Sequence, residues 1–137
     1  MKSLHTLLKV AQRRMDELGV EATRLGQHVD QLRMQEASIV VREETEVALA
    51  ETDPQLAPSL PAYRARVKAQ VQEVRRQISE KEALLAEVRV LLNEAYQEKA
   101  KFEHLIAQEA IRITAERAAR EQAVLDEVAI NRAGAAD

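Results

Sequence analysis

All three prolines of this 137-residue chain lie in one stretch, Asp53-Pro54-Gln55-Leu56-Ala57-Pro58-Ser59-Leu60-Pro61. The residue before a proline is pushed out of helical geometry, so a helix that arrives here must end near Thr52. Ser59 offers a side-chain oxygen as an N-cap for a second helix, and Pro61 is tolerated in its first turn. The sequence therefore predicts one domain over residues 1–137: a helix over about 3–52, a loop over 53–60, a helix over about 61–133 ended by Gly134, and a frayed tail over 134–137.

On the N-terminal side of this loop, apolar residues recur at alternating steps of four and three. Ten of eleven positions are apolar, and Glu36 is the exception. This spacing places the side chains on one narrow stripe, which is typical of a coiled-coil seam. The positions are Leu4, Leu8, Ala11, Met15, Leu18, Ala22, Leu25, Val29, Leu32, Glu36 and Ile39. Gly19 and Gly26 flank the seam, which predicts a close approach of two helices beside them.

The C-terminal side carries a second seam, in which eleven of fourteen positions are apolar. Its members are Val67, Val71, Val74, Ile78, Lys81, Leu85, Val88, Leu92, Ala95, Lys99, Phe102, Ile106, Glu109 and Ile113. Beyond them the stripe slips by about one residue and continues through Ile111, Ala118, Leu125 and Val128, which indicates a local change of supercoil.

Two such helices bury their stripes against each other, so the predicted fold is all-α, an antiparallel two-helix coiled-coil hairpin. With the bend near residue 57, Leu4 lies opposite the region of Glu109. The second helix is longer, and everything after about residue 112 overhangs without a partner in the chain. This overhang still carries Ile113, Ala118, Leu125, Val128 and Ile130. An apolar stripe without an intramolecular partner predicts an intermolecular one.

Composition supports long helices and argues against several other classes. Aromatic residues make up 2% of the chain, cysteine is absent and the formal net charge is −3. Without cysteine there is no disulfide or thiolate metal site. The apolar runs are too short for a membrane span, and the N-terminus is too polar for a signal peptide. We therefore expect a soluble, cytoplasmic protein without a transmembrane segment.

Motifs that carry chemistry are missing from the sequence. The three glycines form no phosphate-binding loop, and His5, His28 and His104 are too far apart in sequence for a local metal site. Two packed helices offer no cleft that excludes water. Arginine doublets in an acidic chain without stacking aromatics argue against nucleic acid. We expect no enzyme activity, no catalytic or metal-binding residue and no cofactor.

Two polar residues interrupt the seams at places that face each other. Glu36 lies opposite the turn from Ile78 to Lys81 if the bend is near residue 57. A seam polar pair of Glu36 and Lys81 fixes the register of the two helices at some cost in stability. Lys99, another polar seam residue, lies opposite Met15, and we expect it to extend its ammonium group to water.

The two ends of the chain carry a resemblance to a known family. Residues 4–17, Leu-His-Thr-Leu-Leu-Lys-Val-Ala-Gln-Arg-Arg-Met-Asp-Glu, resemble the first helix of FliJ proteins, the coiled-coil component of the flagellar type III export apparatus. Residues 120–129, Arg-Glu-Gln-Ala-Val-Leu-Asp-Glu-Val-Ala, are similar to the Glu-Gln-x-x-Leu-Asp-Glu pattern that ends many members. The length, the two unequal helices and Tyr63 at the start of the second agree.

The resemblance implies a non-enzymatic stalk that inserts into the hexameric flagellar export ATPase and promotes its assembly and activity. It also implies a link to the cytoplasmic domain of the export gate protein and to export chaperones. The location that it implies is cytoplasmic, peripheral at the cytoplasmic face of the inner membrane at the flagellar base. The ATPase-binding residues that it implies are Arg117, Arg120, Glu121, Gln122, Leu125, Asp126 and Glu127.

By position, the export-gate contact of the family falls on Gln35, Ile39 and Val74. Arg42 and Glu46 stand where the family has aromatic residues, and Gln70 replaces another. The alternative interpretation of Ile39 and Val74 is hairpin core. Two alternative functions also stay open: the stalk of a virulence-type type III secretion system, and a helical-hairpin chaperone or adaptor.

Overall fold

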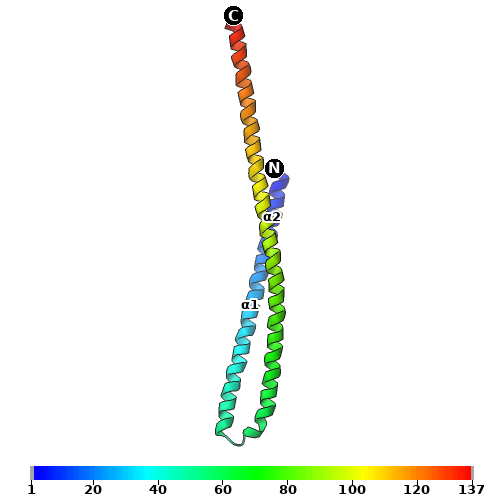
Figure 1. Ribbon diagram of the computed structural model, residues 1–137, viewed down its shortest axis with the longest axis vertical. Coiled ribbons are helices and arrows are strands. Elements are labelled where there is room, and N and C mark those ends of the chain that lie inside the picture. The colour runs from blue at the N-terminus through cyan, green and yellow to red at the C-terminus, as the bar shows by residue number, and fades with distance from the viewer. Residues whose placement is uncertain (1, 137) are drawn as a thin grey trace. The chain divides into compact units, whose positions relative to one another are not determined.

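The computed structural model describes residues 2–136 and consists of two long helices joined by a short turn. Helix α1 spans Lys2–Thr52, the 3₁₀ helix η1 spans Ala57–Ser59 and helix α2 spans Leu60–Ala136. The second helix is the longer, and the two pack against each other as a helical hairpin without strands in the described range (Figure 1). The predicted all-α fold with a longer second helix is confirmed.

Asp53 organises the turn between the helices. Its backbone N–H donates to the Leu49 carbonyl at 3.1 Å and closes α1. Its side-chain Oδ1 accepts the Gln55 N–H at 3.0 Å, and its carbonyl accepts the Leu56 N–H at 3.1 Å. An aspartate that holds the following backbone in this way specifies a turn.

The predicted cap at Ser59 is wrong in its chemistry. The Ser59 hydroxyl donates backwards to the Leu56 carbonyl at 2.8 Å and so does not accept from the first turn of α2. The reason is that η1 runs directly into α2, with the Leu60 N–H donating to the Ala57 carbonyl.

The predicted end at Gly134 is also wrong, because α2 continues through Gly134 to Ala136. No glycine has a positive φ among the described residues, so Gly134 does not adopt the left-handed conformation that ends a helix. The neighbouring alanines favour continuation of the helix.

The chain forms two compact units, which we describe separately. The hairpin unit comprises residues 16–93, and the terminal unit comprises residues 2–15 with 94–136 of the described chain. In the hairpin unit, α1 and α2 lie side by side and are joined by the turn (Figure 1). Its centre is a cluster of Val29, Leu32, Val74 and Ile78, against which the half-buried Ile39 packs.

Two ion pairs across the hairpin unit fix its register. Arg33 pairs with Glu82, and Arg75 Nε lies 2.7 Å from Glu36 Oε1. Both pairs place the middle of the hairpin within about two residues of residue 57, as the seam analysis predicts for two antiparallel helices.

In the terminal unit, the first turns of α1 pack against α2 only as far as Ile113. Ala11 and Ala95 are buried, and Leu4, Leu8 and Ile113 are half-buried. From Thr114 to residue 135, every residue is exposed. The predicted overhang of α2 is therefore confirmed, and we call residues 114–135 the distal segment.

The two seams agree with the structure at every position. All twenty-five predicted seam residues up to Ile113 are buried or half-buried, including the polar Glu36, Lys81, Lys99 and Glu109. The predicted close approach at Gly19 and Gly26 is wrong, because a Cβ added at either position would meet no atom within 4 Å.

Candidate functional site

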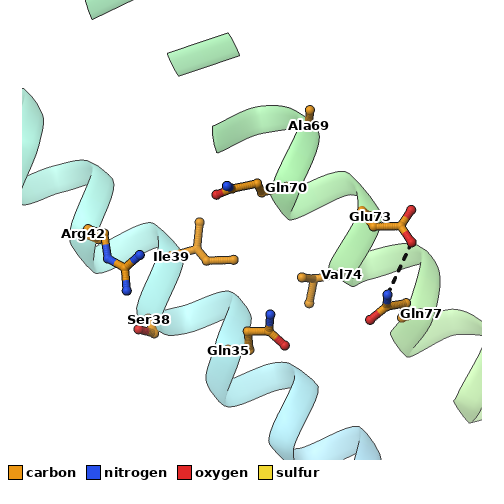
Figure 2. A pocket seen from close by; sticks show the side chains of 9 residues that line it. All are labelled: Gln35, Ser38, Ile39, Arg42, Ala69, Gln70, Glu73, Val74 and Gln77. Carbon is orange, nitrogen blue, oxygen red and sulfur yellow. Dashed lines mark hydrogen bonds between the residues drawn. The ribbon is translucent and has the colours of Figure 1, made fainter. Parts of the chain in front are cut away.

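A groove between α1 and α2 lies in the hairpin unit. Its volume is about 610 Å³. Figure 2 shows Ile39 of α1 directed towards Val74 of α2 between the two helices. The lining residues are Gln35, Ser38, Ile39, Arg42, Ala69, Gln70, Glu73, Val74 and Gln77.

Helical spacing explains why these residues gather. Gln35, Ile39 and Arg42 follow one another at steps of four and three, so they share one face of α1. Gln70, Val74 and Gln77 do the same on α2. The groove therefore has an apolar floor and rims that carry amides and charges.

The three residues implied for the gate contact, Gln35, Ile39 and Val74, all line this groove. Val74 is 5% exposed and belongs to the central cluster, while Ile39 packs against that cluster. Both apolar residues thus contribute to the hairpin core as well as to the groove floor. Gln35 is exposed on the rim, where its amide can donate and accept hydrogen bonds.

The predicted seam pair of Glu36 and Lys81 is not the pair that forms. Glu36 binds Arg75, and the described residues contain no ion pair between Glu36 and Lys81. Arg75 follows the buried Val74 and lies beside the seam. From there its long side chain reaches Glu36 while the charge stays at the edge of the core, which avoids the desolvation that a pair inside the seam requires.

A second hollow of about 260 Å³ lies next to the groove, between the groove and the turn. It shares Ile39, Arg42 and Gln70 with the groove and adds Tyr63, Arg66 and Val67. Of the charged residues that line the two hollows, the sequence analysis named Arg42 but missed Arg66 and Glu73, because it followed the apolar seam. Such residues can be found from the sequence, because they occupy the positions on either side of each seam residue, where coiled coils place the charges that select partners.

On the α2 rim of the groove, neighbouring side chains hold the carboxylate of Glu73 by hydrogen bonds. Arg76 donates to Glu73 at 2.7 Å, and this hydrogen bond lowers the pKa of the Glu73 carboxyl. Gln77 Nε2 donates to Glu73 Oε1 at 3.3 Å (Figure 2). The carboxylate therefore stays ionised at neutral pH, and the rim keeps a negative charge.

The distal segment is the second candidate surface. Val124, Leu125 and Ile130 are 59%, 62% and 71% exposed, and Val128 is 41% exposed. Exposed apolar side chains at this density in a helix without a packed neighbour indicate an interaction site.

The seven residues implied for ATPase binding all lie on the distal segment but do not form one patch. Gln122 Nε2 donates to Asp126 Oδ1 at 3.0 Å. At about 100° per residue, Arg120 and Glu127 lie on the side of the helix away from Leu125. The set therefore surrounds the helix, with Arg117, Glu121, Gln122 and Asp126 flanking Leu125.

Metal-ligand clusters and carboxylates with a shifted pKa are the features of the described residues that bear on chemistry. Within the described residues, no group of three or more His, Cys, Asp or Glu side chains could hold a metal ion. The lowered pKa values of Glu21, Glu73 and Glu109 each have an exposed arginine hydrogen bond as their largest cause. No described helix is long and apolar enough to cross a bilayer.

No protein family, characterised relative or solved structure was found to match this chain. The functional argument accordingly depends on the two surfaces and on the resemblance of the chain ends.

Proposed function

We propose that this chain is a non-enzymatic stalk and coupling factor of a flagellar type III export apparatus. It binds the export ATPase hexamer through the distal segment, promotes assembly and activity of the ring, and links the ring to the export gate protein. In this role the chain acts in the cytoplasm, peripherally at the inner membrane beneath the flagellum.

The observation that carries the proposal is the distal segment. It is a helix of 22 residues, all exposed, with four large apolar side chains and charges on every side. A ring of subunits contacts a helix on its axis from all directions, so a binding surface that surrounds the helix suits a pore better than a flat partner. The similarity of residues 120–129 to the end of FliJ proteins supports the same partner.

Binding to the axis stabilises the assembled ring by mass action, because the stalk binds the hexamer and not its separate subunits. A single asymmetric helix contacts identical subunits unequally, and so it biases their conformations differently. This coupling needs no chemistry from the chain itself.

The groove of the hairpin unit is the proposed gate contact. It offers an apolar floor from Ile39 and Val74 and amides from Gln35 and Gln77, which suit a helical segment with one apolar face. Arg42 and Gln70 stand where the family has aromatic residues, so this contact relies more on polar complementarity.

The test is hydrolysis by the cognate flagellar export ATPase, measured with and without the chain while light scattering reports the mass of the ring. We expect stimulation together with hexamer formation. Leu125→Glu should remove both effects, because it places a charge in the centre of the apolar surface. The folded hairpin should remain, since Leu125 packs against no other part of the terminal unit.

Val20→Glu is the matched control. Val20 is also an apolar residue of high exposure, at 71%, but lies on α1 of the hairpin unit. This variant should stimulate the ATPase like the wild-type chain. If both variants lost stimulation equally, the loss would come from the added negative charge and not from its position on the distal segment. No stimulation by the wild-type chain would contradict the proposal. Client-aggregation assays would then test the chaperone alternative.

A further inference from the structure

We propose that the grooved face of the hairpin unit binds the same face of a second copy of this chain. The two copies are related by a two-fold axis parallel to the helices, and the turn of one copy lies beside the turn of the other. This inference depends on the hairpin unit alone and does not require the proposed ATPase function.

The charges on the two rims of the groove have opposite order. Moving away from the turn, α1 carries first Glu46, one helical turn beyond the groove on the same face, and then the rim residue Arg42. The α2 rim carries Arg66 and then Glu73 over the same interval. The register of the hairpin places Glu46 level with Arg66, since both are about equally far from residue 57. Each acidic rim position is therefore matched by a basic position on the other helix.

Three of these charges form no ion pair with any other residue that the structure describes. Arg42, Glu46 and Arg66 are exposed, and none forms an ion pair with any residue in the described range 2–136. Elsewhere in the same unit, Arg33 and Arg75 are paired across the helices. Glu46 and Arg66 therefore stand at the same level on the two helices without forming an ion pair with each other.

A two-fold axis parallel to the helices brings each unpaired charge of one copy close to an opposite charge of the second copy. It places α1 of one copy over α2 of the other in antiparallel orientation, as in a four-helix bundle. Glu46 then faces Arg66 of the second copy, and Arg42 lies about 3 Å along the axis from the level of the second copy's Glu73. The same contacts form twice, which makes the interface self-complementary.

The groove floor supplies the apolar part of the interface. The half-buried Ile39 of both copies meets its counterpart at the centre, above the buried Val74, flanked by Gln35 of one copy and Gln77 of the other. Two amide side chains can donate to and accept from each other, so Gln35 of one copy can pair with Gln77 of the other.

The size of this face sets the expected affinity. It covers about four turns of each helix, so the buried area falls in the class of small, transient interfaces. We therefore expect a dimer with a dissociation constant of about 10 to 100 µM at low salt. High salt should weaken it, because exposed charge pairs are screened. If the gate also binds in the groove, as proposed above, dimer and gate exclude each other.

The experiment is sedimentation velocity of the full chain from about 5 to 500 µM, a range that brackets the expected constant. Wild-type chain should shift from monomer to dimer. Glu46→Lys and Arg66→Glu should each weaken the dimer at least about tenfold, because like charges then face each other twice. An equimolar mixture of the two variants should regain wild-type affinity. Between unlike chains, the introduced lysine faces the introduced glutamate, and the native Arg66 faces the native Glu46.

Glu44→Lys is the matched control, with the same charge change about 200° around α1 from Glu46. It should dimerise like the wild-type chain. A wild-type chain that stays monomeric, single variants that dimerise normally, or a mixture without recovery would each overturn the proposal. A dimer lost in Leu125→Glu but kept in Glu46→Lys would place the interface on the distal segment instead. Glu46→Lys should still stimulate the ATPase, which separates this proposal from the proposed function.

Discussion

Helix α2 contains two stretches of similar polarity that differ in what covers them. Residues 60–113 pack their apolar stripe against α1, whereas residues 114–135 are exposed at every position. The distal segment holds seven alanines among its 22 residues, and alanine has the highest helix propensity. Packing against α1 thus stabilises residues 60–113, whereas residues 114–135 stay helical through the helix propensity of their own side chains. A surface maintained in this way is available for a partner.

The largest effect should come from shortening a leucine in the packed interface between α1 and α2, compared with the same change in the distal segment. Leu25→Ala removes a side chain that is 2% exposed and should lower the free energy of unfolding by about 2–5 kcal/mol. Leu125→Ala should change it by less than about 0.5 kcal/mol, because this side chain is already in water. Urea unfolding followed by circular dichroism measures both. Equal losses would mean that the distal segment is packed in solution.

Glycine replacements should give a smaller effect of opposite sign. Gly19→Ala and Gly26→Ala should each stabilise the protein by about 0.5–1 kcal/mol, because both positions are helical and a Cβ meets open space. Gly134→Ala should leave the main unfolding transition unchanged, since it lies beyond the packed part of α2. Thermal unfolding of the three variants tests this, and destabilisation by Gly26→Ala would reveal a neighbour that the structure lacks.

The ion pair between Glu36 and Arg75 should contribute less again. Its arginine side chain is 66% exposed and its carboxylate 23% exposed, so solvent screens the attraction. A double-mutant cycle with Glu36→Gln and Arg75→Gln should give a coupling energy of about 0.5 kcal/mol, as for other exposed pairs. The same cycle on Glu36 and Lys81 should give none, and a clear coupling there would restore the seam pair predicted from the sequence.

The smallest effect should be a loss of stability in acid. In the folded chain the pKa values of Glu73 and Glu109 are lowered below 4.5, chiefly by hydrogen bonds from Arg76 and Arg112. Their contribution is present above pH 4.5 and is lost as the pH falls through the lower folded pKa values. Thermal unfolding between about pH 7 and pH 3 should show a small decrease in Tm. An increase in Tm on acidification would contradict these pairs.

The fold could be predicted because few features determine it. The spacing of the seam residues and the prolines at positions 54, 58 and 61 fix both helices and the bend, and the register follows. Details that depend on competition between nearby groups could not be predicted. Glu36 could pair with Lys81 or with Arg75. The hydroxyl of Ser59 could donate to the Leu56 carbonyl or accept from a backbone N–H of α2.

The candidate surfaces were predictable to different degrees. The distal segment follows from the unequal lengths of the two helices, which the sequence shows directly. The groove does not, because its rims depend on which flanking residues the two helices bring to one face. Arg42 and Glu73 look like ordinary surface charges until the register places them on opposite rims.

Hydrogen–deuterium exchange of the full chain with and without the flagellar export ATPase is the most direct test of the central claim. Backbone amides of residues 114–135 should exchange quickly in the free chain, because no tertiary packing protects them. Binding in the ring should slow exchange in this segment, while amides around Leu25 and Val29 stay unchanged. Unchanged exchange in residues 114–135 at saturating ATPase would contradict the distal segment as the binding surface.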